Sequence, residues 1–442
     1  MAAIPVLKVE IDFANGASFG YPLILDDAVY GILDTNILGD QFADIVDITN
    51  QVMGCSVRRG RNRILSNFEA GSATVTINDP NSDFNPQNQY SPYWDNVTNT
   101  SKVVPLRKIR IFAEVTIASV VQEVNIFSGY ITSYDTGFYQ GTQQTSTVVL
   151  QCVDGFRLLN NVSTGPDPVP GCTAGQLSGA RVDELLDFAG FPESMRSTFP
   201  GNSTMQVDPG GARSILQAIQ TVEQSEFGAF FMQRSGSTLF YDRDAVIKRA
   251  DAPVRFYSDT GAPGLFTYQG IDFAFDDQLV LNDITVTRNN DGTLPAPVPQ
   301  TVTDAASIAR FFTKSGQRTG ILVETDQEAN DQANTLLATR KNADLRIDSI
   351  TVNNYADISE LNQIINLSSD IYNLIFVEKT MSGGSNVTKE LFIQGVQHDV
   401  TPTTWVTKLL TAEPLIQGFI LDSELQGILG DTVPQNTNTL SY

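Results

Sequence analysis

Histidine is almost missing from this chain, which has one histidine, His398, in 442 residues. A metal site with two histidine ligands, or a peptidase site of the HExxH type, therefore cannot form within one chain. A nucleophilic Cys–His pair would need His398 beside a cysteine, but no cysteine lies in a recognisable catalytic motif. The GxSxG, GxxxxGK(S/T) and GxGxxG patterns are also missing. We therefore expect a protein that is not an enzyme, with no catalytic residue, metal or cofactor.

Cysteine and long apolar runs are scarce as well. The spacing of Cys55, Cys152 and Cys172 matches no zinc site, and an odd number argues against a disulfide framework. A reducing place of synthesis, such as a cytoplasm, fits this composition. No apolar stretch approaches the roughly 18 residues of a membrane-spanning helix. The N-terminus lacks the basic segment and apolar run of a secretory signal.

Positive charge is in short supply, with 28 Lys and Arg against 50 Asp and Glu and a formal net charge of −22. A chain this acidic should repel nucleic acid, because binding requires cationic groups that neutralise phosphates. The acidity has two explanations that the sequence does not separate. It can serve solubility alone, or it can form a surface or lumen that DNA passes without binding.

One basic cluster interrupts the acidic chain at residues 58–63. Its arginines could form a solvated turn with ion pairs inside the chain, or they could contact carboxylates of a neighbouring subunit. DNA contact is the least favoured of the three explanations, since the surrounding field is negative. The candidate subunit-interface residues of this cluster are Arg58, Arg59, Arg61 and Arg63.

A strand pattern occurs twice in the chain. Residues 126–131 (IFSGYI) precede a polar turn and an apolar run at 147–150. Residues 392–396 (FIQGV) precede a polar turn and an apolar run at 405–409. Glycine inside a strand is typical of a β-bulge or a tight bend. The two patterns predict two related β-domains, and such a duplication would let a trimer present six similar faces.

The expected fold is mainly β with an α+β insertion. Candidate strands are rich in Val, Ile, Thr and Phe and are separated by Asn, Asp, Pro and Gly clusters. Helical spacing predicts helices at 178–190 and 212–222, and the capping box at 325–328 predicts the start of another. The predicted parts are an N-terminal arm at 1–40, a first barrel-like β-domain at 41–155, an α+β middle domain at 156–270, a second barrel-like β-domain at 271–412 and a C-terminal arm at 413–442.

A short apolar motif occurs near both ends of the chain, where Ile-Leu-Asp is followed at the same spacing by Gly-Ile-Leu. Coincidence between two segments rich in Leu and Ile is one explanation. The other is a pair of arms that dock onto neighbouring subunits, because a single chain has little reason to expose the same apolar motif twice. The candidate interface residues in the arms are Ile24, Leu25, Ile32, Leu33, Ile420, Leu421, Ile428 and Leu429.

Two neighbouring loops offer further candidates. Residues 79–85 (DPNSDFN) resemble a calcium loop, but Phe84 stands where the loop needs glycine, so a turn held by Asp and Asn side chains is favoured. The aromatic loop with Tyr90, Tyr93 and Trp94 could stack on sugars or plug a barrel end, and Pro92 favours packing. Spacing alone singles out no carboxylate pair for glycoside hydrolysis.

Several segments, taken in order, resemble minor tail proteins of long-tailed bacteriophages. In the second half, residues 391–400 (LFIQGVQHDV), with Trp405 and Thr407 following, are similar to the closing hairpin of distal tail hub proteins. The resemblance covers roughly residues 45–412, and each motif is short. The segments of the first half are 58–61 (RRGR), 68–77 (FEAGSATVTI), 84–86 (FNP), 91–93 (SPY) and 105–111 (PLRKIRI).

The resemblance implies a baseplate-hub-like structural protein at the tail tip of the virion, synthesised in the host cytoplasm. Such hubs form a homotrimeric ring in which two barrel-like domains per protomer match the sixfold tail tube. The implied partners are the distal tail protein ring, other tail tip or fibre proteins and the tape measure protein, with DNA in transit during ejection and a possible host-surface contact. No catalytic residue is carried over, and the chain has no appended lysozyme-like domain. A receptor- or glycan-binding tail adhesin is the alternative function, and a tail-associated wall hydrolase is a third.

Overall fold

The computed structural model describes residues 4–16, 44–61, 67–139, 145–247, 255–262, 264–292, 295–356, 360–384 and 386–413. Within them the expected mainly β fold with a small helical part is confirmed. One sheet of 13 strands runs through the molecule, and within the described residues it stays open and forms no closed barrel. Its spatial order is β16-β20-β23-β22-β3-β4-β9-β8-β7-β1-β2, with β21 beside β22 and β15 beside β21.

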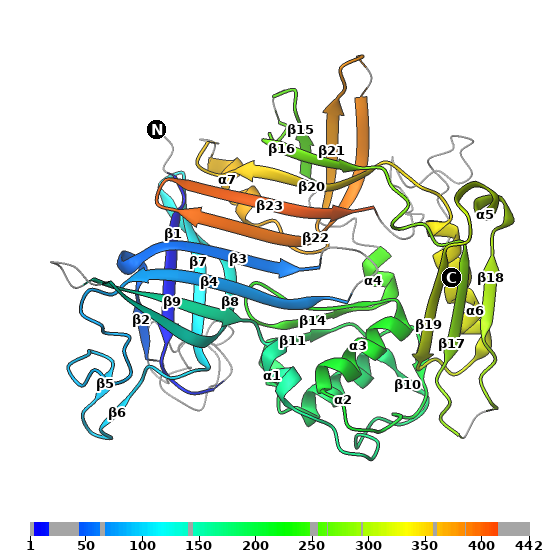
Figure 1. Ribbon diagram of the computed structural model, residues 1–442, viewed down its shortest axis with the longest axis horizontal. Helices are drawn as coiled ribbons and strands as arrows, with labels where there is room; N and C mark the ends of the chain where they lie inside the picture. Colours follow the sequence, from blue (N-terminus) through cyan, green and yellow to red (C-terminus); the bar gives the residue numbers. More distant parts are fainter. Residues whose placement is uncertain are drawn as a thin grey trace.

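Most strands of this sheet lie across the view in Figure 1, one below another, and β1 and β7 cross them at the left. Their bounds are β1 Val6–Asp12, β2 Ile45–Asp47, β3 Val52–Gly60, β4 Glu69–Asn78, β7 Arg107–Ile117, β8 Val120–Tyr139, β9 Thr145–Val153, β15 Arg255–Ser258, β16 Gly270–Ala274, β20 Arg346–Asn353, β21 Leu374–Thr380, β22 Asn386–Thr401 and β23 Thr404–Ala412. A short 3-10 turn, Thr49–Gln51, precedes β3.

The sheet contains the same arrangement of six strands twice. In the first unit the spatial order is β3-β4-β9-β8-β7-β1, and in the second unit it is β16-β20-β23-β22-β21-β15. In both units the strands follow one another along the chain in the same sequence, with the last two forming a hairpin. The units differ at one end, because β1 pairs antiparallel with β7 whereas β15 pairs parallel with β21. This common topology supports the predicted pair of related β-units.

A β-bulge fixes how the two units correspond. In the β8–β9 hairpin the register skips Thr132, and in the β22–β23 hairpin it skips Gln394. Ile131 therefore corresponds to Ile393, and Ser133 to Gly395. The sequence pattern made Gly129 the equivalent of Gly395 instead, because a short motif does not fix which residues correspond. Gly129 has its own steric reason, since a Cβ there would lie 2.3 Å from the carbonyl oxygen of Val153.

Each unit has its own hydrophobic core on one face of the sheet. The alternation of apolar and polar residues along the strands places Val57, Val75 and Leu150 in the core of the first unit. Ile350 and Leu409, which lie opposite each other on β20 and β23, are in the core of the second unit. Trp405, on β23, has no exposed surface and packs in the first core, so the second unit completes the core of the first.

The α+β middle region follows the first unit, and its two predicted helices are present as α2 and α3. Ser214 and Gln217 form a capping box at the start of α3, and Phe227 ends the helix with a left-handed backbone. The elements of this region are α1 Phe156–Asn161, β10 Gln176–Leu177, α2 Ser178–Phe188, a 3-10 turn Glu193–Met195, β11 Arg196–Thr198, β12 Thr204–Met205, α3 Ile215–Glu226, β13 Ala229–Met232, β14 Thr238–Tyr241 and α4 Arg243–Ile247.

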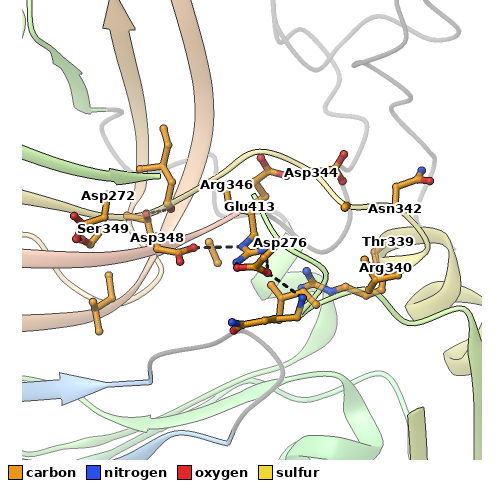
Figure 2. Close-up of a pocket in the computed structure, with 18 of the residues that line it drawn as sticks. Asp272, Asp276, Thr339, Arg340, Asn342, Asp344, Arg346, Asp348, Ser349 and Glu413 are labelled. Atoms are coloured by element: carbon orange, nitrogen blue, oxygen red, sulfur yellow. Dashed lines mark hydrogen bonds and ion pairs between the residues drawn. The ribbon is translucent and has the colours of Figure 1, made fainter. Parts of the chain in front are cut away.

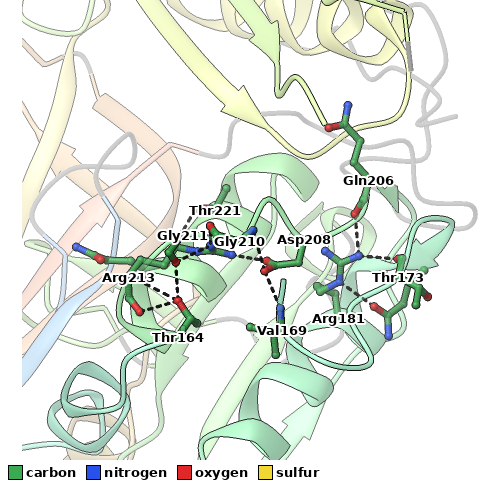
Figure 3. Close-up of polar contacts among 12 residues, drawn as sticks. Thr164, Val169, Thr173, Arg181, Gln206, Asp208, Gly210, Gly211, Arg213 and Thr221 are labelled. Carbon is green, nitrogen blue, oxygen red and sulfur yellow. Dashed lines mark hydrogen bonds and ion pairs between the residues drawn. The ribbon is translucent and has the colours of Figure 1, made fainter. Parts of the chain in front are cut away.

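Buried polar side chains fix the loops of the middle region (Figure 3). Arg181, on α2, has no exposed surface and donates to the carbonyl oxygens of Thr173 and Gln206 at 2.7 and 2.8 Å. Asp208 accepts a hydrogen bond from the backbone N–H of Val169 at 3.0 Å and pairs with Arg213. These contacts satisfy the buried backbone groups of loops that have little regular structure.

A smaller sheet is inserted between β16 and β20 of the second unit. The predicted capping box is present, since the Thr325 hydroxyl accepts from the Glu328 N–H and the Glu328 carboxylate accepts from the Thr325 N–H, both at 3.2 Å. The sequence missed most of this insertion, which has its own apolar core. Its elements are β17 Asp283–Arg288, β18 Gln300–Thr303, α5 Ala305–Phe311, β19 Ser315–Ile321 and α6 Asp326–Arg340, while α7 Glu360–Leu367 precedes β21 and β5 Trp94–Asp95 and β6 Thr100–Ser101 lie before β7.

Candidate functional site

The junction between the two units is a direct strand pairing. β3 of the first unit pairs antiparallel with the second half of β22, from Gly60 opposite Gly395 to Cys55 opposite Val400. Gly60 has a φ of +97°, and a Cβ there would lie 2.3 Å from the carbonyl oxygen of Gln394. The close backbone approach at this end of the junction therefore requires glycine.

Two of the predicted interface arginines lie buried at this junction. Arg59 is 3% exposed, and its guanidinium donates to Asp370 at 2.8 Å. Arg61 is 6% exposed, donates to the Gln394 side chain at 2.8 Å and to the Tyr372 hydroxyl at 2.9 Å, and lies over the Phe68 ring. Both arginines join β3 to segments of the second unit, so their described contacts are inside the chain.

The other two arginines differ from this buried pair. Arg58 is half-buried on the opposite face of β3 and pairs with Glu69 at 3.4 Å. Arg63 lies outside the described residues. A subunit-interface role for the cluster stays a prediction, and Arg58 is the described member that is available for such a contact.

A buried carboxylate completes the junction on the side of the first unit. Asp154 accepts hydrogen bonds from the backbone N–H groups of Gly71 at 2.6 Å and Phe156 at 3.0 Å. Burial raises the pKa of Asp154 to about 7, although these hydrogen bonds and nearby Arg59 oppose the shift. The carboxyl group therefore changes protonation near neutral pH.

We expect Asp154 to make the stability of the fold depend on pH. Its pKa of about 7 in the folded chain lies above the value of about 3.9 in an unfolded chain. The folded chain therefore binds more protons, and the stabilising contribution is complete below about pH 4 and lost as the pH rises to about 7. Relative to the wild type, Asp154→Asn should gain stability by up to about 1.4 kcal/mol per pH unit across that interval. Urea unfolding at several pH values tests this, and parallel curves for the two proteins would contradict it.

The face of the sheet opposite the cores is mainly polar, and most of its side chains are half-buried or exposed. We call it the open face, and it comprises the outward side chains of β16, β20, β23, β3, β4, β9 and the second halves of β22 and β8. In the described part of this face the cations Arg58, Arg346 and Lys408 are each ion-paired with a carboxylate. Its other side chains include Ser56, Ser72, Thr74, Thr76, Asn78, Asp135, Thr147, Val149, Gln151, Asp272, Thr351, Gln397, Asp399 and Val406.

The sequence analysis missed this face, although its signal was present. In β4, Ser72, Thr74 and Thr76 alternate with the buried Ala73 and Val75. Such alternation predicts a strand with one wet face. It does not show that eight strands from two units align these polar residues into one surface, because that alignment depends on the long-range β3–β22 pairing.

A pocket of about 330 Å³ lies at one end of the open face, between the second unit and the end of α6 (Figure 2). Arg346 donates to Asp276 at 3.2 Å and to Asp348 at 3.3 Å, as the dashed lines show. Lys408, which also lines the pocket, pairs with Asp272 at 3.0 Å. Arg346 and Lys408 are therefore both ion-paired, and the lining also contains the charged residues Arg340, Asp344 and Glu413.

The aromatic loop does not form one exposed surface. Tyr93 is 7% exposed and packs in the first core, with ring centroids 4.9 Å from both Phe13 and Phe84. Tyr90 is 98% exposed, and Trp94 is half-buried. The adjacent Asp79 carboxylate accepts from the N–H groups of Asp83 and Phe84, which is the turn that the sequence favoured over a calcium loop. Sugar binding by the three aromatic residues stays an untested prediction.

The histidine and the three cysteines are buried inside the fold. His398 accepts or donates at Nδ1 to the Thr407 hydroxyl at 2.9 Å, and burial lowers the pKa of His398 to about 3. Burial raises the pKa of the Cys55 thiol to about 12 and that of Cys172 to about 11. No group of three or more His, Cys, Asp and Glu residues in the described chain is placed to hold a metal ion. Nor does any described helix have the length and apolar character needed to cross a membrane.

Ile24, Leu25, Ile32 and Leu33, together with Ile420, Leu421, Ile428 and Leu429, lie outside the described residues. The described part of the predicted N-terminal arm includes β1, which pairs with β7 along its whole length and belongs to the sheet. Docking by the arms therefore stays a prediction.

Comparison by sequence finds no relative, since no protein-family model and no curated protein matches this chain. Comparison by structure gives a different result. The tail protein from Neisseria meningitidis MC58 superposes with a TM-score of 0.52 over 93% of this chain and 97% of its own length, at 12% identity. The chain has the fold of phage tail proteins.

A second solved structure with this tail-protein fold is the 43 kDa tail protein of prophage MuSo2 from Shewanella oneidensis. It superposes with a TM-score of 0.51 over 84% of this chain and 94% of its own length, at 11% identity. Both structures are matched over nearly their full length. At 11–12% identity the similarity establishes the fold of the chain, and the roles of its residues are inferred from its own structure.

Proposed function

We propose that this chain is a structural component of a phage tail tip, a hub whose three copies form a ring that closes or extends the tail tube. The observation that carries the proposal is the repetition of one six-stranded topology in a single chain. Three copies of a chain with two such units supply six similar units, which can stack on a sixfold tube. The tail-protein fold supports the same conclusion.

The open face supplies the wall of the channel in this ring. Its hydroxyl and amide side chains present no strip of unpaired positive charge, since Arg58, Arg346 and Lys408 are matched by carboxylates. DNA held by many phosphate contacts would not move through a channel. A wall of neutral and weakly acidic groups lets the tape measure protein and then DNA pass without binding.

The proposed neighbours follow from this position in the tail. A distal tail protein ring lies above the hub, and tip or fibre proteins attach below it. The segments that carry the two apolar motifs, 24–33 and 420–429, would clasp neighbouring subunits. We assign no catalytic step to the chain, because its described histidine and cysteines are buried and engaged in the cores.

The mass of the purified protein in solution tests the ring. Light scattering over a range of concentrations should approach three times the chain mass of 48.2 kDa. A stable dimer or tetramer, or a monomer at every concentration, would count against a three-copy ring.

A further inference from the structure

Several strand edges of the large sheet lack a partner strand in the described chain, and two of them lie on the strands β8 and β16. The second half of β8, residues 133–139, pairs with β9 along one edge, while β7 covers only the first half of β8 along the other. β16 pairs with β20 along one edge, and no described strand lies along its other edge. Open edges of this kind recruit a strand from another chain.

The repeat shows what each open edge corresponds to. Through the shared bulge, the second half of β8 corresponds to the second half of β22, so Gly137 corresponds to Asp399 and Phe138 to Val400. The correspondence continues across the sheet, from β9 and β23 through β4 and β20 to β3 and β16. Asp272 therefore corresponds to Ser56, and Ile271 to Cys55. Within the chain, the edges of β22 and β3 are joined to each other.

A pair of glycines marks the same correspondence in the sequence. Gly54 on β3 lies opposite Thr76, and Gly270 on β16 lies opposite Thr351, at corresponding positions. A Cβ on Gly54 would lie 3.4 Å from the carbonyl oxygen of Val400 on the paired β22. Gly270 has the corresponding position on β16, where a Cβ would lie 3.5 Å from the Cβ of Thr351 on β20, and no described strand lies along the other edge.

We propose that the second half of β8 pairs antiparallel with β16 of a second copy of this chain. The register repeats the junction inside the chain, with Gly137 opposite Asp272 and Phe138 opposite Ile271, as Asp399 lies opposite Ser56 and Val400 opposite Cys55. This inference rests on the proposed ring and specifies its subunit contact. Each copy offers one β8 edge and one β16 edge, so the contact is heterologous, and every β8 and β16 edge is paired only when the ring closes.

The chemistry at the proposed contact is compatible with this register. Gly137 brings no side chain against Asp272, whose carboxylate accepts from Ser349 at 2.5 Å and pairs with Lys408 at 3.0 Å. Asp272 therefore keeps its partners when the second strand arrives. The new pairing satisfies backbone groups along both edges, and it continues the open face from one copy to the next.

Engineered disulfides test the register. Directly opposite residues in an antiparallel pair have Cα atoms about 4.5–5.5 Å apart, which suits a disulfide. The variant with Gly137→Cys and Asp272→Cys should give covalent dimers and trimers on a non-reducing gel after mild oxidation. Each single variant should give none, since the native cysteines are buried. The matched control, Ser56→Cys with Asp399→Cys, should close a disulfide within one chain and leave the mass unchanged.

Light scattering on the same samples separates the two proposals. A trimeric mass with covalent trimers supports the register. A trimeric mass without cross-links, while the Ser56–Asp399 control oxidises, would overturn the β8–β16 contact and leave the ring intact. A mass that never exceeds one chain, without cross-links, would overturn both the contact and the proposed ring.

Discussion

Replacing Arg59 by alanine should lower the free energy of unfolding by about 3–5 kcal/mol. The guanidinium is 3% exposed and holds Asp370 at 2.8 Å across the junction of the two units. Without Arg59, the partly buried Asp370 carboxylate keeps only a weaker ion pair, because Arg234 lies 3.7 Å away. A buried ion pair costs most when one partner is removed, because the other charge stays desolvated.

Arg58→Ala is the matched control for this prediction. Arg58 is the preceding residue on the same strand, but its side chain is 42% exposed and its partner Glu69 is 61% exposed. Exposed ion pairs contribute about 0–1 kcal/mol, so this variant should unfold close to the wild type. Urea unfolding of the three proteins measures both effects. Equal losses for the two variants would show that burial at the junction does not decide the role of these arginines.

Reversing charge on the open face should create DNA binding. The variant with Asp135→Lys and Asp399→Lys adds two cations per chain on a surface whose described cations are ion-paired. If this face lines the channel, a three-copy ring gathers all six lysines around one lumen. Affinity for linear double-stranded DNA at low salt should then rise on the order of 100-fold, and it should fall steeply as salt is added.

A second double variant controls for net charge alone. Asp167→Lys with Glu193→Lys makes the same change in charge on exposed residues of the middle region. This control should show a much smaller gain, because its lysines do not converge on one surface. A filter-binding titration compares the two variants. Equal gains would contradict the assignment of the open face to the channel.

The local elements of this fold were predictable from sequence because their signals are local. Thr325 and Glu328 marked the start of α6 through a capping box that is present. Runs rich in Val, Ile, Thr and Phe, separated by clusters of turn residues, marked β3, β4, β8 and β9. The repeat itself was visible, since both hairpins carry apolar runs around a polar turn.

The long-range arrangement was not predictable in the same way. Arg59 and Arg61 were grouped with Arg58 as one basic cluster, but strand alternation and Gly60 send them to a buried junction with Asp370 and Tyr372. Each of those partners is more than 300 residues away from its arginine in the sequence, and no local sequence pattern predicts such a contact. The strands β18 and β19 of the inserted sheet, and the pairing of β17 with β19, were missed for a related reason. β17 and β19 are parallel neighbours separated by β18 and α5, and hairpin signals do not reveal such a pairing.

Electron cryomicroscopy of the assembled protein would test the central claim most directly. The proposed ring predicts three copies around a channel, six β-units of similar shape, and a continuous inner sheet in which β8 of one copy meets β16 of the next. The open face would line the channel. An assembly with another number of copies, or one in which the copies meet through the helical middle region and leave these edges apart, would contradict it.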